Sequence, residues 1–203
     1  KILALDSSAV SASAAVLDDD KVLGEFFINT KQTHSQTLMP MVQQVLIQTK
    51  TSLEEIDLFA VSAGPGSFTG VRIGVACVKG MAFAQNKPCI GVSTLEAMAY
   101  PLSMLNGIIC AVMDARCQQV YHALFRVNGS KVERIYDDCA VAISDLAESL
   151  RQYSDETIYL VGDGAKLCYE SEAFQPLQVQ LIAEHLQYQR AVGVAQCAIM
   201  HLK

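Results

Sequence analysis

Hydrophobic and polar positions form short runs at the start of the chain that are typical of β-strands. They predict strands at residues 2–6, 11–17 and 22–28. Residues 33–49 carry apolar positions three and four apart, which predicts an amphipathic helix. The runs that follow predict a strand, a helix, a short strand and a helix, at 58–63, 68–86, 88–92 and 94–105.

The second half of the chain begins with the same order of patterns. Strand-like runs at 108–114, 119–126 and 131–141 precede a helix at 144–152, a strand at 157–161 and, after a poorer stretch, a helix at 191–202. Each half opens with an apolar strand that ends in an aspartate, Asp6 or Asp114, which is a weak internal duplication.

These patterns predict an α/β protein of two lobes, residues 1–106 and 107–203. We expect each lobe to contain a mixed sheet that opens with a three-strand meander. Asn106-Gly107, a dipeptide that favours turns, marks the boundary between the lobes.

Composition and charge exclude several classes of protein. Of the 203 residues, 51% are hydrophobic, which is enough for one substantial core or two modest ones. Lys79 interrupts the best apolar stretch, so we expect no transmembrane helix, and Asp6 comes too early for a signal peptide. We expect an initiator methionine before Lys1. A net charge of −6 leaves no basic stripe for nucleic acid, so any RNA would be held mainly by a partner.

Cysteine usage points to a reducing compartment. The seven cysteines are odd in number and form no Cys-x-x-Cys pair, so a disulfide framework or a zinc knuckle is not expected. We interpret them as small buried hydrophobic residues of a cytoplasmic protein.

A glycine-rich segment, residues 64–74, joins a predicted strand to a predicted helix. It lacks the spacing of a Walker A loop, a dinucleotide-binding fingerprint or a nucleophile elbow. Gly66, Gly70 and Gly74 recur every four residues and so line one helix face with small groups. Such a face allows a second helix to approach closely, while the helix N-terminus suits a phosphate. We favour the helix-packing interpretation.

Two lobes that each begin with a three-strand meander resemble the actin, Hsp70 and sugar-kinase superfamily (ASKHA, RNase H-like). That resemblance implies that Asp6, Ser7 and Ser8 form a turn facing nucleotide phosphate, with Asp6 holding a metal-bound water. It also implies that Gly162 and Gly164 could approach an adenine or ribose. The alternative is that both segments are ordinary turns, capped by the side chains of Asp6 and Ser8.

Residues 60–98 resemble the Kae1/TsaD family of tRNA threonylcarbamoyl transferases. The resemblance rests on the glycine segment and on the runs Met81-Ala82-Phe83-Ala84, Pro88-Cys89-Ile90-Gly91-Val92 and Leu95-Glu96-Ala97. Catalytic members of that family bind a metal through the histidines of a His-x-Glu-x-His motif. This chain has Thr94 and Met98 at those two positions, and neither suits the ions such chemistry uses. We therefore predict no metal site and no catalysis by this chain.

Further motifs are similar to non-catalytic paralogues of that family: residues 33–40, residues 66–74, and Asp114-Ala115-Arg116 followed by Gln119-Val120-Tyr121. The similarity covers most of the chain and implies a partner subunit of a TsaD-type enzyme. With a TsaE-type ATPase and the threonylcarbamoyl-adenylate synthase, that enzyme modifies the adenosine next to the anticodon of ANN-decoding tRNAs. The similarity also implies a homodimer when the chain is alone, no cofactor of its own, and ADP or ATP as a candidate ligand at the subunit boundary.

We predict that the partner docks on the first two long helices of the N-terminal lobe. The first helix carries an apolar stripe, and the second carries the glycines that recur every four residues. Together they offer more apolar surface than one core requires. The alternative is that helices of the same lobe cover this surface. The predicted interface comprises His34, Leu38, Met41, Val42, Val45, Gly66, Phe68, Gly70, Arg72, Ile73 and Gly74.

Two residues, His34 and Arg72, could indicate functions other than partner binding. His34 lies beside Ser35, but the sequence places no acid near them, so we interpret His34 as a packing or capping residue rather than part of a hydrolase triad. Arg72 begins an apolar helix, so we expect it to meet a carboxylate or a phosphate. The remaining histidines, at 122, 185 and 201, show no ligand spacing. A nucleotide-binding ATPase or phosphotransferase and a metallopeptidase-like protein stay as alternatives.

Overall fold

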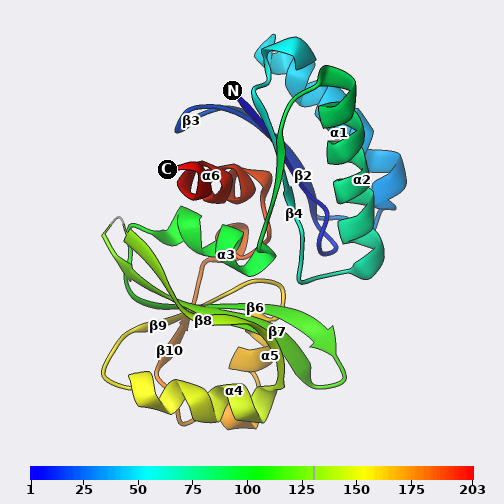
Figure 1. Cartoon of the computed structure of the whole chain (residues 1–203). Coiled ribbons are helices and arrows are strands. Elements are labelled where there is room, and N and C mark those ends of the chain that lie inside the picture. Colours follow the sequence, from blue (N-terminus) through cyan, green and yellow to red (C-terminus); the bar gives the residue numbers. More distant parts are fainter. Residues whose placement is uncertain (130) are drawn as a thin grey trace. The chain divides into compact units, whose positions relative to one another are not determined.

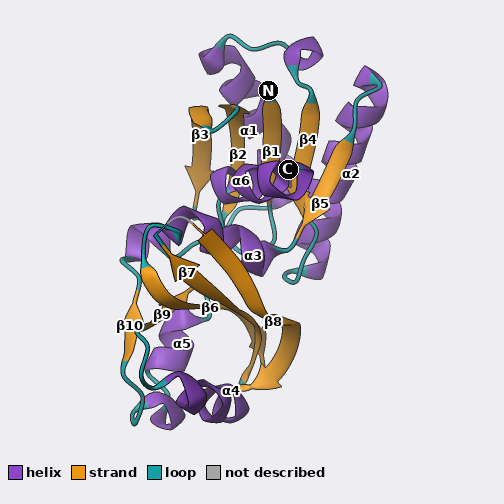
Figure 2. Ribbon diagram, turned by 60° about the vertical axis from the view of Figure 1, so that its left-hand side comes forward, coloured by secondary structure: helices purple, strands orange, loops and turns teal. Residues whose placement is uncertain are grey.

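The computed structural model describes residues 1–129 and 131–203 and contains two compact units. Unit 1 consists of Lys1–Ala97 and Gln189–Lys203, and unit 2 consists of Met98–Tyr188. Each unit is built on one five-stranded sheet. Figures 1 and 2 show the two sheets and the helices packed on them. The prediction of an α/β protein with two mixed sheets, each opening with a three-strand meander, is confirmed.

The sheet of unit 1 has the strand order β3-β2-β1-β4-β5. An antiparallel meander is followed by two parallel strands, so β1 pairs with β2 on one side and with β4 on the other. All residues of β1 and β4 are buried, as expected for the apolar centre of a sheet covered on both faces. The strands are β1 Ile2–Asp6, β2 Ala12–Asp18, β3 Lys21–Ile28, β4 Leu58–Ser62 and β5 Cys89–Val92.

Three long helices cover this sheet. In Figure 1, α1 (His34–Thr49) and α2 (Phe68–Gln85) lie on one face, and α6 (Ala191–Leu202) lies on the other. The short helix α3 (Thr94–Ala99) follows β5. The core beneath α1 and α2 gathers Leu3, Leu5, Leu38, Val45 and Phe59, each with 0% of its surface exposed.

The sheet of unit 2 has the order β10-β9-β6-β7-β8. Its antiparallel meander β6-β7-β8 adjoins the parallel strands β9 and β10. Helix α4 contributes Leu146 and Leu150 to the core, and α5 contributes Cys168. The elements are β6 Asn106–Arg116, β7 Gln119–Asn128, β8 Lys131–Ala142, α4 Ile143–Leu150, β9 Ile158–Val161, α5 Ala165–Tyr169 and β10 Val179–Leu181.

The predicted lobe boundaries differ from the observed units. The division at residue 106 is wrong because the chain leaves unit 1 after Ala97 and returns to it at Gln189. The return has a clear cause: the second face of the first sheet is apolar, and α6 packs there with six buried residues. The predicted helix at 94–105 is also shorter than expected, since Pro101 has no N–H to donate and a 3-10 turn, Tyr100–Leu102, replaces its continuation.

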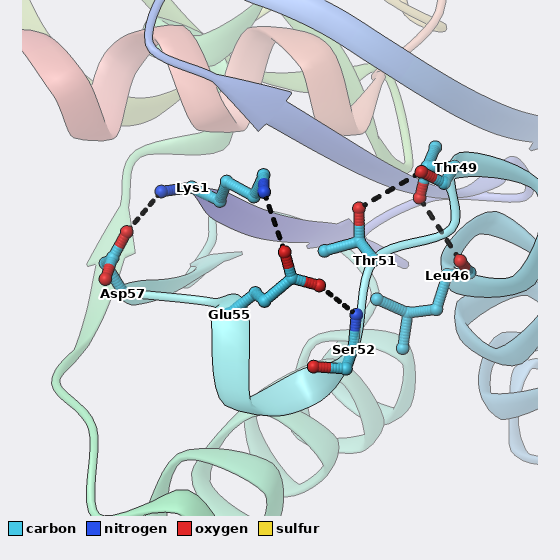
Figure 3. A network of polar contacts seen from close by, with 7 residues as sticks. All are labelled: Lys1, Leu46, Thr49, Thr51, Ser52, Glu55 and Asp57. Atoms are coloured by element: carbon cyan, nitrogen blue, oxygen red, sulfur yellow. Dashed lines mark hydrogen bonds and ion pairs between the residues drawn. The ribbon is translucent and has the colours of Figure 1, made fainter.

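Side chains fix the connection from α1 to β4, which is drawn in Figure 3. Glu55 accepts a hydrogen bond from the Ser52 backbone N–H at 2.8 Å and from Lys1 Nζ at 3.0 Å. The Ser52 amide, with Lys1 adding to it, lowers the pKa of Glu55. Thr49 Oγ1 donates to the Leu46 carbonyl at 3.3 Å, so this carbonyl in the last turn of α1 has a hydrogen-bond partner.

Candidate functional site

The glycine-rich segment fastens the start of α2 to the turn that follows β1. Ser67 caps the helix, because its Oγ accepts from the Gly70 N–H at 3.3 Å. Its own backbone N–H donates to the Ser8 carbonyl at 2.6 Å. Ser7 Oγ donates to the Gly70 carbonyl at 2.9 Å. The turn and the helix N-terminus therefore hold each other in place.

Gly70 and Gly74 allow the close contact between α2 and the turn after β1. A Cβ on Gly70 would lie 2.0 Å from the Ser7 carbonyl oxygen, and a Cβ on Gly74 would lie 2.6 Å from Ser7 Oγ. Both glycines are buried, and Gly66, which precedes the helix, is half-buried. The expectation that Gly70 and Gly74 admit a second helix is therefore wrong: what approaches α2 here is the backbone and side chain of Ser7 within unit 1.

Asp6, Ser7 and Ser8 form a closed polar cluster. Each is only 1% exposed. Asp6 Oδ1 accepts from the Ser8 N–H at 3.0 Å and from Ser8 Oγ at 2.8 Å, and its other carboxylate oxygen accepts from Ser62 Oγ. Burial raises the pKa of Asp6, although the hydrogen bonds from Ser62 and Ser8 oppose the rise.

This arrangement matches the capping alternative and not the phosphate-facing one. The serine hydroxyls donate to Gly70 and Asp6, which leaves neither of them directed at a ligand oxygen. The prediction that Asp6, Ser7 and Ser8 present their side chains to a nucleotide is therefore not borne out within unit 1.

His34 braces the same turn. Its Nε2 donates to the Ala9 carbonyl at 2.7 Å, which places the proton on Nε2 and removes that nitrogen as a base for Ser35. The interpretation of His34 as a packing residue fits this contact and the half-buried ring, and its contact with a partner stays a prediction.

The turn around Gly162 and Gly164 packs tightly on β6 in unit 2. A Cβ on Gly162, whose φ is +110°, would lie 1.9 Å from the Val112 carbonyl oxygen. A Cβ on Gly164 would lie 2.9 Å from the Met113 carbonyl carbon. Both glycines are thus required by the close approach of two backbone segments, which explains them without a bound nucleotide.

The apolar stripe of α1 belongs to the core of unit 1. Leu38 and Val45 are 0% exposed, Val42 is 2% exposed and Met41 is 7% exposed. All four pack against β-strand residues such as Leu5 and Phe59. The prediction that these side chains contact a partner is wrong, because the sheet of the same unit already covers them. Ile73 of α2 also packs against this core.

A different face of α2 is open. Phe68 is 69% exposed and Phe83 is 89% exposed, and between them Ala76 and Gly80 are exposed too. With Arg72, these residues recur at three- and four-residue intervals and so share one helix face. We call this set the α2 face. Phe68 and Arg72 were predicted for the interface, and the other three were missed although their spacing was visible in the sequence.

Arg72 is an exposed member of the α2 face. Its guanidinium carbon lies 3.8 Å from the centre of the Phe68 ring, which is a cation–π contact. Within the described residues Arg72 therefore meets an aromatic ring and not a carboxylate, while a phosphate or carboxylate of another molecule stays a prediction. An arginine stacked on an exposed aromatic ring is instead typical of the residues that interfaces select.

The two positions that hold metal-binding histidines in the resembling transferases are buried here. Thr94 is 0% exposed and Met98 is 5% exposed. The Met98 methyl group lies 3.2 Å from the place where a Cβ on Gly162 would be. Neither side chain presents a ligand atom to solvent that could replace an imidazole.

One cysteine–histidine pair has the wrong electrostatics for a nucleophile and its base. Cys139 Sγ lies 3.1 Å from His122 Nε2. Burial raises the pKa of the Cys139 thiol and lowers the pKa of His122, so both groups favour their neutral forms. Among the described residues none of the seven cysteines is in a disulfide, as the sequence predicted.

Of the described helices, none has the length and apolar character needed to cross a membrane.

Comparisons with known proteins agree on the fold. The structure superposes on "YeaZ from Pseudomonas aeruginosa" with a TM-score of 0.81 at 25% identity, covering 99% of this chain and 91% of that one. It also superposes, at a TM-score of 0.52 and 12% identity, on the ROK hexokinase from Thermus thermophilus. The fold is therefore the one shared with sugar kinases of this kind, as the two meanders predicted.

Sequence comparisons define the family. Residues 21–196 match the family model described as "TsaD: tRNA N6-adenosine threonylcarbamoyltransferase". The tRNA threonylcarbamoyladenosine biosynthesis protein TsaB of Escherichia coli (strain K12) is 32% identical, over 91% of this chain and 88% of the relative. The protein of the same name from Bacillus subtilis (strain 168) is 33% identical, over 80% and 71%. The chain belongs to the TsaB (YeaZ) family, which confirms the resemblance found in the sequence.

Proposed function

We propose that this protein is the non-catalytic partner subunit of a TsaD-type transferase in tRNA threonylcarbamoyladenosine biosynthesis. Its relatives named TsaB support the pathway. The observation that carries the subunit role is the α2 face: two aromatic side chains, 69% and 89% exposed, on a helix whose opposite side is fixed in the core. Such side chains are the usual anchors of protein interfaces.

The chemistry of the α2 face suits a helix from another subunit. Ala76 and Gly80 are small, and among the described residues nothing outside the helix's own nearby backbone lies within 4 Å of a Cβ placed on Gly80, so a second helix could approach the backbone closely. Phe68 and Phe83 lie on either side of Ala76 and Gly80 along the helix, and Arg72 adds a positive charge to this surface. The same face would serve two partners in turn: the TsaD-type subunit in the complex and a second copy of the chain in the homodimer.

The absence of catalysis rests on Thr94 and Met98. Both are buried, and they stand where the resembling transferases carry metal-binding histidines. A buried alcohol and a thioether do not replace two imidazoles for a hard or borderline ion. We propose that the partner supplies the metal and the reaction at the adenosine next to the anticodon of ANN-decoding tRNAs.

The net charge and the Asp6 cluster indicate how tRNA and nucleotide would join the complex. A net charge of −6 favours an indirect contact with tRNA, through the partner. Asp6, Ser7 and Ser8 are engaged with each other, with Ser62 and with Gly70, so we propose no nucleotide held by this chain alone. ADP or ATP, and the TsaE-type ATPase, would join at the boundary between this chain and the transferase.

Reconstitution tests this function. The mixture contains tRNA, the TsaD-type enzyme, the TsaE-type ATPase and the threonylcarbamoyl-adenylate synthase, with this chain present or absent. We expect modified adenosine only when both this chain and the TsaD-type enzyme are present. Product that is unchanged when this chain is omitted would overturn the subunit role, and product formed without the TsaD-type enzyme would assign catalysis to this chain.

Two alternative functions can be told apart from the proposed one by experiment. An ATPase or phosphotransferase of this fold would bind ATP as the isolated chain, which calorimetric titration with Mg-ATP measures directly. A metallopeptidase-like protein would cleave peptides in a chelator-sensitive manner. A serine hydrolase built on Ser35 and His34 is not supported, since His34 Nε2 donates to the Ala9 carbonyl.

A further inference from the structure

Three metal-ligating side chains converge at one point of unit 1. Cys197 and His201 lie four residues apart on α6 and therefore project from the same side of that helix. Glu96 of α3 reaches the same point. His201 Nε2 lies 3.1 Å from Glu96 Oε1 and 3.8 Å from Cys197 Sγ. The three donor atoms lie within 4.8 Å of one another.

The two separations that involve His201 are close to those expected around one tetrahedral ion, and the sulfur and the carboxylate oxygen lie within 4.8 Å of each other. With Zn–S near 2.3 Å and Zn–N and Zn–O near 2.1 Å, tetrahedral angles place sulfur about 3.6 Å from nitrogen and nitrogen about 3.4 Å from oxygen. The observed 3.8 and 3.1 Å differ from these values by only a few tenths of an ångström. A single imidazole nitrogen cannot hydrogen-bond fully to both a thiol and a carboxylate, whereas one cation can bind all three atoms at once.

We propose that Glu96, Cys197 and His201 form a zinc site. Zinc accepts thiolate, imidazole and carboxylate ligands together, while magnesium and calcium select oxygen alone. The cysteine is 0% exposed, whereas the side chains of Glu96 and His201 are 14% and 39% exposed. The ion thus enters from the histidine side, and water completes its fourth position.

This site differs from the metal motif of the resembling transferases. It uses the glutamate of Thr94-Leu95-Glu96-Ala97-Met98 but neither of the flanking positions. Its other two ligands come from α6, which is far away in sequence. The sequence prediction that this chain has no metal site considered His201 by itself and missed the Cys-x-x-x-His spacing on a predicted helix.

The ion would fasten α6 to α3. Helix α6 packs on the sheet of unit 1, α3 directly follows β5, and most of the chain between them forms unit 2, so a metal bridge closes a long segment at its two ends. A ligand that binds only the folded state stabilises that state in proportion to its affinity and concentration. Zinc is therefore expected to raise the melting temperature of the chain.

Metal titration tests the site on the whole chain. The protein is freed of metal with a chelator, then titrated with Co²⁺, whose thiolate charge-transfer and visible bands report a tetrahedral sulfur-containing site. Zinc affinity is measured by competition with a chromophoric chelator. We expect one zinc per chain, and at least about a tenfold weaker affinity in His201→Gln and in Glu96→Gln. These substitutions are preferred to changes at Cys197, whose full burial makes folding sensitive to it.

Two matched variants control for adventitious binding. His185→Gln removes an exposed histidine of unit 2, and a Cys89→Ser/Cys117→Ser double variant removes the two exposed thiols. Both should bind zinc and melt with zinc as the original chain does. The proposal is overturned if the original chain binds less than one equivalent, if His201→Gln binds with unchanged affinity, or if the double variant loses binding. These readouts do not involve tRNA modification, so they are independent of the subunit role.

Discussion

The carbonyl oxygen of Ser7 occupies the space that a side chain on Gly70 would need, since a Cβ there would lie only 2.0 Å away. Real Cβ atoms do not approach backbone this closely, so Gly70→Ala must displace either α2 or the turn after β1. We predict a loss of about 1–3 kcal/mol in the free energy of unfolding. Urea unfolding followed by circular dichroism measures it.

Gly80→Ala is the matched control in the same helix. In the part of the chain that the structure describes, nothing outside the helix's own nearby backbone lies within 4 Å of a Cβ at this position. Alanine favours a helix interior over glycine by about 0.5–1 kcal/mol, so this variant should be more stable than the original chain. If both substitutions shift the urea midpoint in the same direction, the close contact between Ser7 and Gly70 does not limit the packing of α2.

Phe83 should matter for association and not for folding. Its side chain is 89% exposed, so Phe83→Ser removes little buried surface. If the α2 face is the interface, losing an aromatic anchor should weaken binding to the TsaD-type enzyme by about 2 kcal/mol, roughly thirtyfold in Kd. Calorimetric titration measures the affinity, and thermal melting verifies that the fold is intact.

Met104→Ser controls for the loss of an exposed apolar side chain. Met104 is 65% exposed but lies in unit 2, outside the α2 face. This variant should bind the transferase as the original chain does. Equal affinities for Phe83→Ser and the original chain would exclude Phe83 from the interface and remove the main structural support for docking at α2.

Ser13 should stabilise the start of α6. Its Oγ accepts the Ala191 N–H at 2.7 Å, and Glu25 accepts the Val192 N–H at 3.2 Å and a side-chain hydrogen bond from Arg190. Ser13→Ala leaves a buried N–H unpaired, which costs about 1–3 kcal/mol of unfolding free energy. Chemical denaturation of the whole chain measures the loss.

Ser11→Ala is a close control for that loss. Ser11 is buried as Ser13 is, with 1% and 0% exposed respectively, but the Ser11 Oγ is without a hydrogen-bond partner among the described residues. Removing this hydroxyl should leave stability unchanged or slightly higher, since an unpaired buried polar group is unfavourable. A loss equal to that of Ser13→Ala would mean that the cap on α6 contributes nothing specific.

The sequence predicted the sheets well because their signals are local. Runs such as 2–6 and 58–63 are apolar enough to identify central strands, and the helix predicted at 191–202 is observed with those bounds. The return of that helix to unit 1 could not be predicted. It depends on Ser13 and Glu25, whose contacts with the helix span 178 and 167 residues of chain.

The candidate site was predicted in part for a similar reason. Periodicity correctly identified Leu38 and Val45 as one apolar face of α1, but periodicity alone cannot say whether a face meets its own sheet or another protein. The glycine spacing correctly indicated close packing against α2, yet the neighbour is the Ser7 turn. The exposure of Phe83 was not predicted, because its spacing from Phe68 and Arg72 is visible in the sequence but a helix that is apolar nearly all round does not show which face is the outer one.

Asp6 should make stability fall as pH rises. Burial raises its pKa above the ordinary value of 3.8, so the folded state holds the proton more tightly than the unfolded state does. The resulting stabilisation is complete below 3.8 and is lost as pH rises through the folded pKa. The unfolding free energy of the original chain minus that of Asp6→Asn should therefore decrease with pH and then level off, because asparagine does not titrate.

For Glu55→Gln, the difference in unfolding free energy from the original chain should change with pH in the opposite direction to that of Asp6→Asn. Measuring both variants in one pH series therefore tests the sign of each pKa shift. The Ser52 N–H and Lys1 lower the pKa of Glu55 below 4.5, so its stabilisation is present above that value and disappears as pH falls through the folded pKa. Glu55 is exposed, so the change should be small. A difference for Asp6→Asn that instead grows with pH would mean that the hydrogen bonds from Ser62 and Ser8 outweigh burial, and the Asp6 cluster would then be a preformed anionic site.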